Sequence, residues 1–229
     1  MRIAVIADPH ISQLDYEHCG MPLNRSIPNL HAVVESVNRE RPDLAVWLGD
    51  LTHEGTPQVR AAFALIRREL RVPDVALVGN HDVETISKRD FARSTPIVRR
   101  MWLSADGWDI AFIDTVQEFS PADPNGVITE ADGVFLRDMA RHSPRNLLVF
   151  SHHPINPDFT RETERFMGAV ESLDGLVVHL GGHSHVSRRQ EDGRRRLIEV
   201  ESCNMPLSWQ RVELGESDLR LERIDVGRS

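Results

Sequence analysis

Histidine and aspartate side chains gather in five short polar clusters along the chain. The clusters occupy residues 8–10, 49–53, 79–82, 152–154 and 181–185, and they contain seven of the 11 histidines. Burying two carboxylates, one amide and four or more imidazoles from these clusters together would be costly without a counter-charge, which a metal ion supplies. Nitrogen and oxygen donors without a thiolate favour Mn, Fe, Zn or Co over calcium or a structural zinc ion.

These donors are too many for one metal ion. An ion takes about four to six ligands, so the excess favours two ions about 3.5–4 Å apart that share a carboxylate. Such a pair activates water for phosphoryl transfer. Residues i and i+2 of an extended segment point the same way, so we expect Asp8 and His10 to hold one centre together. The same spacing predicts that His183 and His185 share a centre.

Each cluster follows or ends a short apolar run that is rich in β-branched residues, which indicates a strand buried on both faces. Ligands of open α/β sheets bind at the carboxyl ends of the strands, so these segments should deliver their side chains to one edge. Helical periodicity fills the intervals, with Thr56 as a cap and Pro96 as a kink or an end. The expected strands are residues 3–7, 44–48, 75–78, 110–113, 147–150 and 176–180, and the expected helices are residues 29–39, 57–70, 84–100, 129–141 and 160–173.

The residues after His185 have a different pattern. Alternating runs occupy residues 186–191, 194–200, 207–214 and 219–226, and Asp192-Gly193 is a strong hairpin signal between the first two. We therefore expect βαβ units in the first two-thirds of the chain and antiparallel strands in the rest.

Composition excludes several classes of protein. The 229 residues carry 27 basic and 35 acidic side chains, a net charge of −8 that argues against a nucleic-acid partner. No apolar stretch approaches the length of a membrane helix, which argues against a membrane partner. Cys19 and Cys203 form neither a zinc motif nor a disulfide framework, so a reduced cytoplasmic protein is expected. We expect a single domain over residues 1–229, and the sequence specifies no oligomeric state.

The five clusters, taken in order, resemble the calcineurin-like metallophosphoesterase superfamily. The resemblance runs from residue 3 to about residue 186, and residues 29–55 are most similar to the branch of class III cyclic nucleotide phosphodiesterases. It implies an α/β fold, a four-layer α/β/β/α sandwich of two mixed sheets flanked by helices. It also implies a dinuclear metal site at the carboxyl ends of the strands.

The resemblance also implies a role for each site residue. Asp50 would bridge the two ions, and His81 would contact phosphate and protonate the leaving oxygen. Asp82 would hold the imidazole of His81 in position, while His53 and His153 are candidates for contact with substrate. One ion would be held by Asp8, His10, Asp50 and His185, and the other by Asp50, Asn80, His152 and His183.

The expected function is a binuclear phosphoesterase that cleaves phosphodiesters, such as cyclic or open-chain nucleotides, by attack of a metal-bridging hydroxide. The alternatives are a phosphomonoesterase acting on a small phosphorylated metabolite, a nuclease using the arginines at 188–189 and 194–196, and a non-catalytic scaffold. Family diesterases often carry a cap over the site, whereas only 44 residues follow His185 and barely complete the second sheet. We therefore expect an open site, with the loops at 11–28 and 114–125 as substrate walls.

Overall fold

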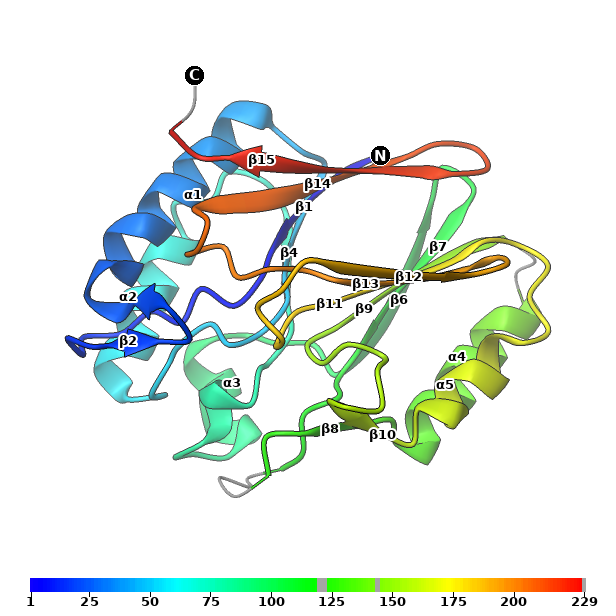
Figure 1. The fold of residues 1–229 in the computed structure, drawn as a ribbon, viewed down its shortest axis with the longest axis horizontal. Helices are drawn as coiled ribbons and strands as arrows, with labels where there is room; N and C mark the ends of the chain where they lie inside the picture. The colour runs from blue at the N-terminus through cyan, green and yellow to red at the C-terminus, as the bar shows by residue number, and fades with distance from the viewer. Residues whose placement is uncertain (119–122, 143–144, 228–229) are drawn as a thin grey trace.

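A computed structural model of the chain describes residues 1–118, 123–142 and 145–227. Two mixed β-sheets lie face to face, and helices cover both outer faces (Figure 1). The first sheet has the strand order β15-β14-β1-β4-β5, and the second has the order β12-β13-β11-β9-β7-β6. The expected four-layer α/β/β/α sandwich is confirmed.

The strands and helices have the following bounds. The first sheet contains β1 (Arg2–Ile6), β4 (Leu44–Trp47), β5 (Asp74–Ala76), β14 (Ser208–Leu214) and β15 (Leu219–Asp225). The second contains β6 (Arg100–Ala105), β7 (Trp108–Ile113), β9 (Asn146–Ser151), β11 (Val177–Gly181), β12 (Arg188–Asp192) and β13 (Arg195–Glu199). The helices are α1 (Ser26–Glu40), α2 (Pro57–Arg67), α3 (Lys88–Ser94), α4 (Glu130–His142) and α5 (Thr163–Val170). Short pieces are β2 (Glu17–His18), β3 (Met21–Pro22), β8 (Gly126–Val127), β10 (Thr160–Arg161) and the 3-10 turns Leu23–Arg25 and His81–Val83.

Three apolar layers hold the sandwich together. The central layer lies between the sheets and contains Val5 and Val46 of the first sheet with Phe112 of the second. A second layer joins the other face of the first sheet to α1, α2 and α3, and a third joins the second sheet to α4 and α5. Strands β1, β4, β7, β9 and β11 are therefore buried on both faces, as their unbroken apolar runs predict.

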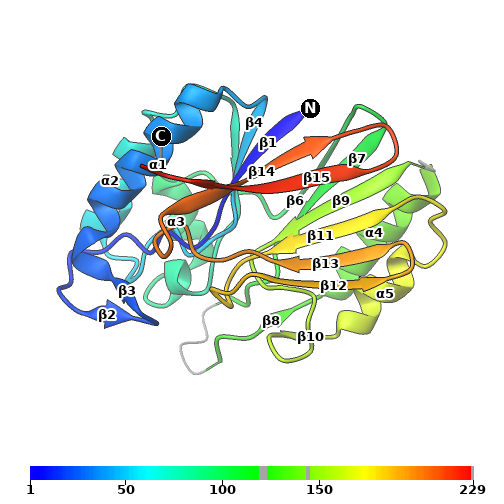
Figure 2. The ribbon, with the colours of Figure 1, turned by 45° about the horizontal axis from the view of Figure 1, so that its top comes forward.

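The C-terminal strands divide between the two sheets. Strands β12 and β13 extend the second sheet beside β11, whereas β14 and β15 extend the first sheet beside β1 (Figure 2). The expectation that this part of the chain only completes the second sheet is therefore wrong. The hairpin at Asp192-Gly193 is confirmed, but β13 pairs with β11 in parallel, not antiparallel.

Three expected helices are shorter than the periodicity suggested. The helix expected over 84–100 is limited to α3, because Thr95 is extended before Pro96, and β6 begins soon afterwards. Residues 160–161 form β10, so the helix expected over 160–173 is reduced to α5. Helix α2 ends at residue 67 instead of 70, while Thr56 caps it before Pro57 as expected.

We expect acid to destabilise the fold partly through His179. This side chain is fully buried, and its Nε2–H donates to Ser151 Oγ at 2.7 Å, since the Ser151 hydroxyl itself donates to the backbone oxygen of His153. Burial lowers the pKa of His179 from 6.5 to about 3. The unfolded chain binds a proton at this position below pH 6.5 that the folded chain does not bind. The free energy of unfolding should therefore fall between pH 6.5 and about 3, by up to about 1.4 kcal/mol per pH unit from this group.

Urea titrations of His179→Leu over this acidic range test the expectation. The variant should lose free energy of unfolding less steeply than the wild type as the pH falls. His31→Leu, which replaces a half-exposed histidine paired with Glu69, is the matched control. An unchanged slope in His179→Leu would contradict the assignment.

Candidate metal centre

The first group of candidate ligands lies at the ends of strands β1, β4 and β11. Asp8, His10, Asp50 and His185 each place a donor atom within 4.8 Å of the others. His10 Nε2 lies 3.0 Å from His185 Nε2 and 3.3 Å from Asp50 Oδ2. Nitrogen atoms that converge in this way on a carboxylate form a donor set suited to a divalent transition metal.

The second group lies beside the first and shares Asp50 with it. Asn80 Oδ1 is 2.9 Å from both His152 Nε2 and His183 Nδ1. His152 Nε2 is also 3.5 Å from Asp50 Oδ1, whereas the other oxygen of Asp50 faces His10. The two carboxylate oxygens of Asp50 thus face two separate groups of donors.

His183 and His185 belong to different groups. We expected each i, i+2 pair to lie in an extended segment and to serve one centre, but the backbone is not extended. Asp8 and His10 have φ values of 47° and 41°, and His183 and His185 have values of 67° and 56°. Asp50, with φ of 46°, is a fifth candidate ligand in this left-handed region, which is rare for residues other than glycine. Backbone strain of this kind gathers at functional sites.

Glycine allows the strand ends to approach one another closely. A Cβ atom on Gly79 would lie 2.0 Å from the backbone nitrogen of Asp50 and 2.1 Å from its Oδ1 atom. A Cβ atom on Gly182 would lie 2.4 Å from Asp8 Oδ2. The backbone nitrogen of His183 can therefore donate to both carboxylate oxygens of Asp8, each at 3.0 Å.

Burial and neighbouring charges shift the pKa values of the candidate metal ligands. Burial first, and then the nearby charge of Asp50, raise the pKa of Asp8 well above its usual value. Burial alone would also raise the pKa of Asp50, but the surrounding imidazoles, His152 foremost, outweigh it and hold this pKa well below its usual value. Burial lowers the pKa of His183 to about 3 and that of His185 to about 4. Neutral imidazoles keep the lone pairs that metal ions bind.

His152 is oriented from outside the donor group. Its Nδ1 atom lies 2.8 Å from the backbone oxygen of Leu48, to which it donates, so its Nε2 atom is left to face Asn80 and Asp50. A metal-binding histidine is commonly fixed through its second nitrogen in this way. The donor types, the tautomer and the burial of this site all fit a pair of divalent ions.

Asp82 does not position the ring of His81. Its buried carboxylate accepts hydrogen bonds from the backbone nitrogens of Leu51, Thr52 and Gly79, at 2.8–3.1 Å. Burial, followed by the charge of Asp50, raises the pKa of Asp82 to about 7. His81 Nδ1 instead lies 3.0 Å from the backbone oxygen of His53, which replaces Asp82 as the positioning group. The expected contact is therefore wrong, because Asp82 fastens the loop that carries Asp50.

His153 lies in the interior, and the structure does not support contact with substrate. It is fully buried, with Nδ1 3.0 Å from Thr115 Oγ1 and Nε2 2.8 Å from the backbone oxygen of Pro124. Both ring nitrogens are thus occupied by the protein. Part of the expected wall at 114–125 falls on residues 119–122, which lie outside the described residues.

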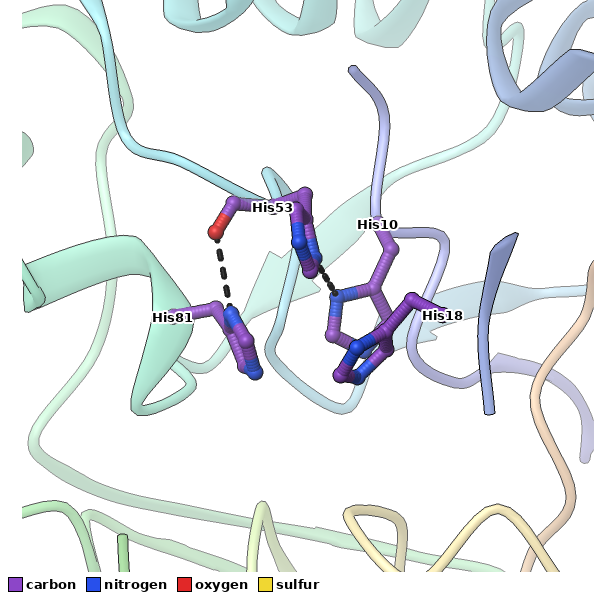
Figure 3. A group of neighbouring side chains, drawn as sticks. All are labelled: His10, His18, His53 and His81. Atoms are coloured by element: carbon purple, nitrogen blue, oxygen red, sulfur yellow. Dashed lines mark hydrogen bonds between the residues drawn. The ribbon is translucent and has the colours of Figure 1, made fainter. Parts of the chain in front are cut away.

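His18 is a neighbour of the site that the sequence analysis did not single out. Its ring centroid lies 4.7 Å from that of His53 and 5.2 Å from those of His10 and His81 (Figure 3). The strand-end rule could not identify it, because His18 lies in β2, a short strand outside both sheets. The expected substrate wall at 11–28 does include this residue.

A family model described as calcineurin-like phosphoesterase matches residues 1–187. The chain belongs to this family. Membership places it among metal-dependent phosphoester hydrolases, the class that the sequence resemblance indicated. Among the described residues, no helix is both long enough and apolar enough to span a membrane.

Individual relatives agree with this assignment. A probable cyclic nucleotide phosphodiesterase of Rhodopseudomonas palustris is 33% identical over 168 residues, which are 67% of this chain and 57% of that relative. The 3',5'-cyclic adenosine monophosphate phosphodiesterase CpdA of Pseudomonas aeruginosa is 25% identical over 87% of this chain and 74% of its own length. The crystal structure of a dimetal phosphatase from Danio rerio is similar in fold, with a TM-score of 0.84 over 98% of both chains at 16% identity.

The position of Asp50 predicts how substitutions change metal content. Asp50→Asn removes the charge that faces both groups and should prevent stable binding of either ion, whereas Asp8→Asn affects one group. Elemental analysis after dialysis should find about two ions per wild-type chain, about one in Asp8→Asn and close to none in Asp50→Asn. Equal metal content in the two variants would contradict the sharing of Asp50.

Proposed function

We propose that this protein is a two-metal phosphodiesterase acting on cyclic or open-chain nucleotides. The observation that carries the proposal is the position of Asp50, whose two carboxylate oxygens face separate donor groups. Asp8, His10 and His185 would hold one ion with Asp50, and Asn80, His152 and His183 the other. When bound, such a pair supplies a nucleophile at neutral pH and neutralises the charge on phosphate. Mn, Fe, Zn and Co all suit these ligands.

His81 is the proposed proton donor to the leaving oxygen. Its Nδ1–H group donates to the backbone oxygen of His53, and its Nδ1 atom lies 3.8 Å from Glu84 Oε2. These contacts occupy Nδ1 and not Nε2, and a fifth of the side chain (19%) is exposed to solvent. When both ring nitrogens are protonated, the proton on Nε2 is the one that His81 can transfer to a departing alkoxide.

Two alternative functions have less support. The arginines that a nuclease would use are paired with acids, for example Arg194 with Asp174 and Arg196 with Asp218. Such pairs leave little free charge to attract a polynucleotide backbone. A phosphomonoesterase remains the second candidate, because the same donor set binds the phosphate of monoesters.

We include a single domain in the proposal. We also include a reducing cytoplasm, since Cys19 and Cys203 are free thiols.

A turnover screen tests the proposed function. The Mn-loaded protein should hydrolyse bis(p-nitrophenyl) phosphate and 3',5'-cyclic AMP faster than p-nitrophenyl phosphate and 5'-AMP. A chelator should abolish turnover, and added Mn²⁺ should restore it. Faster turnover of the monoesters would replace the proposal with a phosphomonoesterase, and no turnover at full metal loading would favour a scaffold.

His81→Ala should separate metal binding from proton transfer. Loss of a general acid typically costs about 10²–10⁴-fold in rate, and we expect this loss on nucleoside diesters. The loss should be smaller on nitrophenyl diesters, because nitrophenolate departs without a proton. Metal content should match the wild type, and His31→Ala is the control. Equal losses on both substrates would indicate that His81 positions phosphate, and loss of metal would make it a ligand.

A further inference from the structure

The candidate ligand His10 has a second contact on the side away from the donor group. Its Nε2 atom faces His185 and Asp50, and its Nδ1 atom lies 3.2 Å from Nδ1 of His53 (Figure 3). His53 Nε2 in turn lies 2.6 Å from the hydroxyl oxygen of Tyr16. Three side chains thus form a chain of hydrogen bonds that leads from the metal group to the half-exposed Tyr16.

Metal binding would fix the direction of every proton in this chain. If Nε2 of His10 offers its lone pair to an ion, the proton of the neutral ring is on Nδ1. That N–H group can only donate, so Nδ1 of His53 accepts. A neutral His53 then carries its proton on Nε2 and donates to the oxygen of Tyr16. The hydroxyl proton of Tyr16 is left to donate to another group.

The backbone fixes the separation of the two rings. His10 N donates to the backbone oxygen of Asp50 at 2.9 Å, and His53 N donates to that of Ile11 at 3.0 Å. His10 is fully buried and His53 is 5% exposed, so solvent has little access to either contact. A buried ring nitrogen without a partner would be costly, which makes the contact between His10 and His53 a requirement of the fold.

We propose that His53 is a positioning residue that holds His10 in its metal-binding tautomer and links Tyr16 to the metal group. The proposal rests on the metal site of the proposed function but not on the substrate. A carboxylate or a backbone oxygen usually accepts the second proton of a metal-binding histidine. An imidazole in this place also has a donor on its far side, so the segment that carries Tyr16 is tied to the same ligand.

A metal ion between the rings is the competing explanation. His10, His18, His53 and His81 each place a nitrogen within 4.8 Å of the others, which is close enough for ligands of one ion. His10 would then have to bind ions through both nitrogens and lose its remaining proton. The additional metal ion would also place its positive charge next to the charges of the two proposed ions. A shared proton avoids both costs.

Two substitutions of His53 separate hydrogen bonding from packing. His53→Phe keeps a ring that can stack on His81, which lies 4.7 Å away between centroids, but it cannot accept a proton. In His53→Asn, the Oδ1 atom of asparagine is bonded to Cγ, as Nδ1 is in histidine. The variant therefore keeps a hydrogen-bond acceptor for His10 but loses the contact with Tyr16. His31→Phe is the control for replacement of an exposed histidine.

Calorimetric titration with Mn²⁺ gives the affinity of each ion without any measurement of turnover. We expect His53→Phe to lower the affinity for one of the two ions by about 10–100-fold and to leave the affinity for the other unchanged. His53→Asn should restore most of that affinity, and Tyr16→Phe should have the smaller effect. In Zn-loaded, ¹⁵N-histidine-labelled protein, the Nδ1–H signal of His10 should be protected from exchange in the wild type and in His53→Asn, but not in His53→Phe.

Three results would overturn the proposal. They are wild-type affinity for both ions in His53→Phe, equal losses in His53→Phe and His53→Asn, and a third ion per wild-type chain that His53→Phe removes. The last result would place an ion, not a proton, between the rings. Two tightly bound ions without diester turnover would refute the proposed function alone.

Discussion

The arrangement of this protein follows from one electrostatic constraint, the burial of two carboxylates among imidazoles whose nitrogens face one another. Asp8 and Asp50 are buried together, and His10 Nε2 and His185 Nε2 are 3.0 Å apart. Lone pairs and negative charges brought this close repel unless cations lie between them. The sandwich supplies the rigidity that holds them there, because the strands that precede these residues are packed on both faces.

The loops at the strand ends give up local stability to achieve this geometry. Five candidate ligands have left-handed backbone conformations, and the remaining contacts of the loops must offset that strain. The carboxylate of Asp82 accepts four hydrogen bonds from these loops, two of them from the backbone nitrogen and the hydroxyl of Thr52. Its carboxylate therefore acts on the site through the backbone, which explains why a buried acid lies next to His81 without touching its ring.

Sequence patterns could predict the buried strands and the meeting of the strand-end clusters, because parallel strands bring their carboxyl ends to one edge, whereas the four-layer sandwich was predicted from the family resemblance. They could not predict details that depend on tertiary contacts. An i, i+2 rule assumes extended backbone, so it paired His183 with His185, whereas the left-handed loop directs them to different groups. Edge strand β6 was missed because its residue types do not alternate: Met101, Trp102 and Leu103 are apolar in succession, although their burial alternates. His18 reaches the site from a segment with no periodic signal.

The pairing of β1 with β14 has a consequence for the order of events during synthesis. Asp8 leaves the ribosome early, but the groups that hold its segment come late: His183 N binds its carboxylate, Ser202 Oγ binds its backbone oxygen, and β14 pairs with β1. A nascent chain therefore cannot form the ligand geometry until the residues up to β14 have emerged. Contacts between such distant residues also form slowly. The residues that would choose between metal ions therefore come together only late, and a partly made chain would offer an ion no complete site.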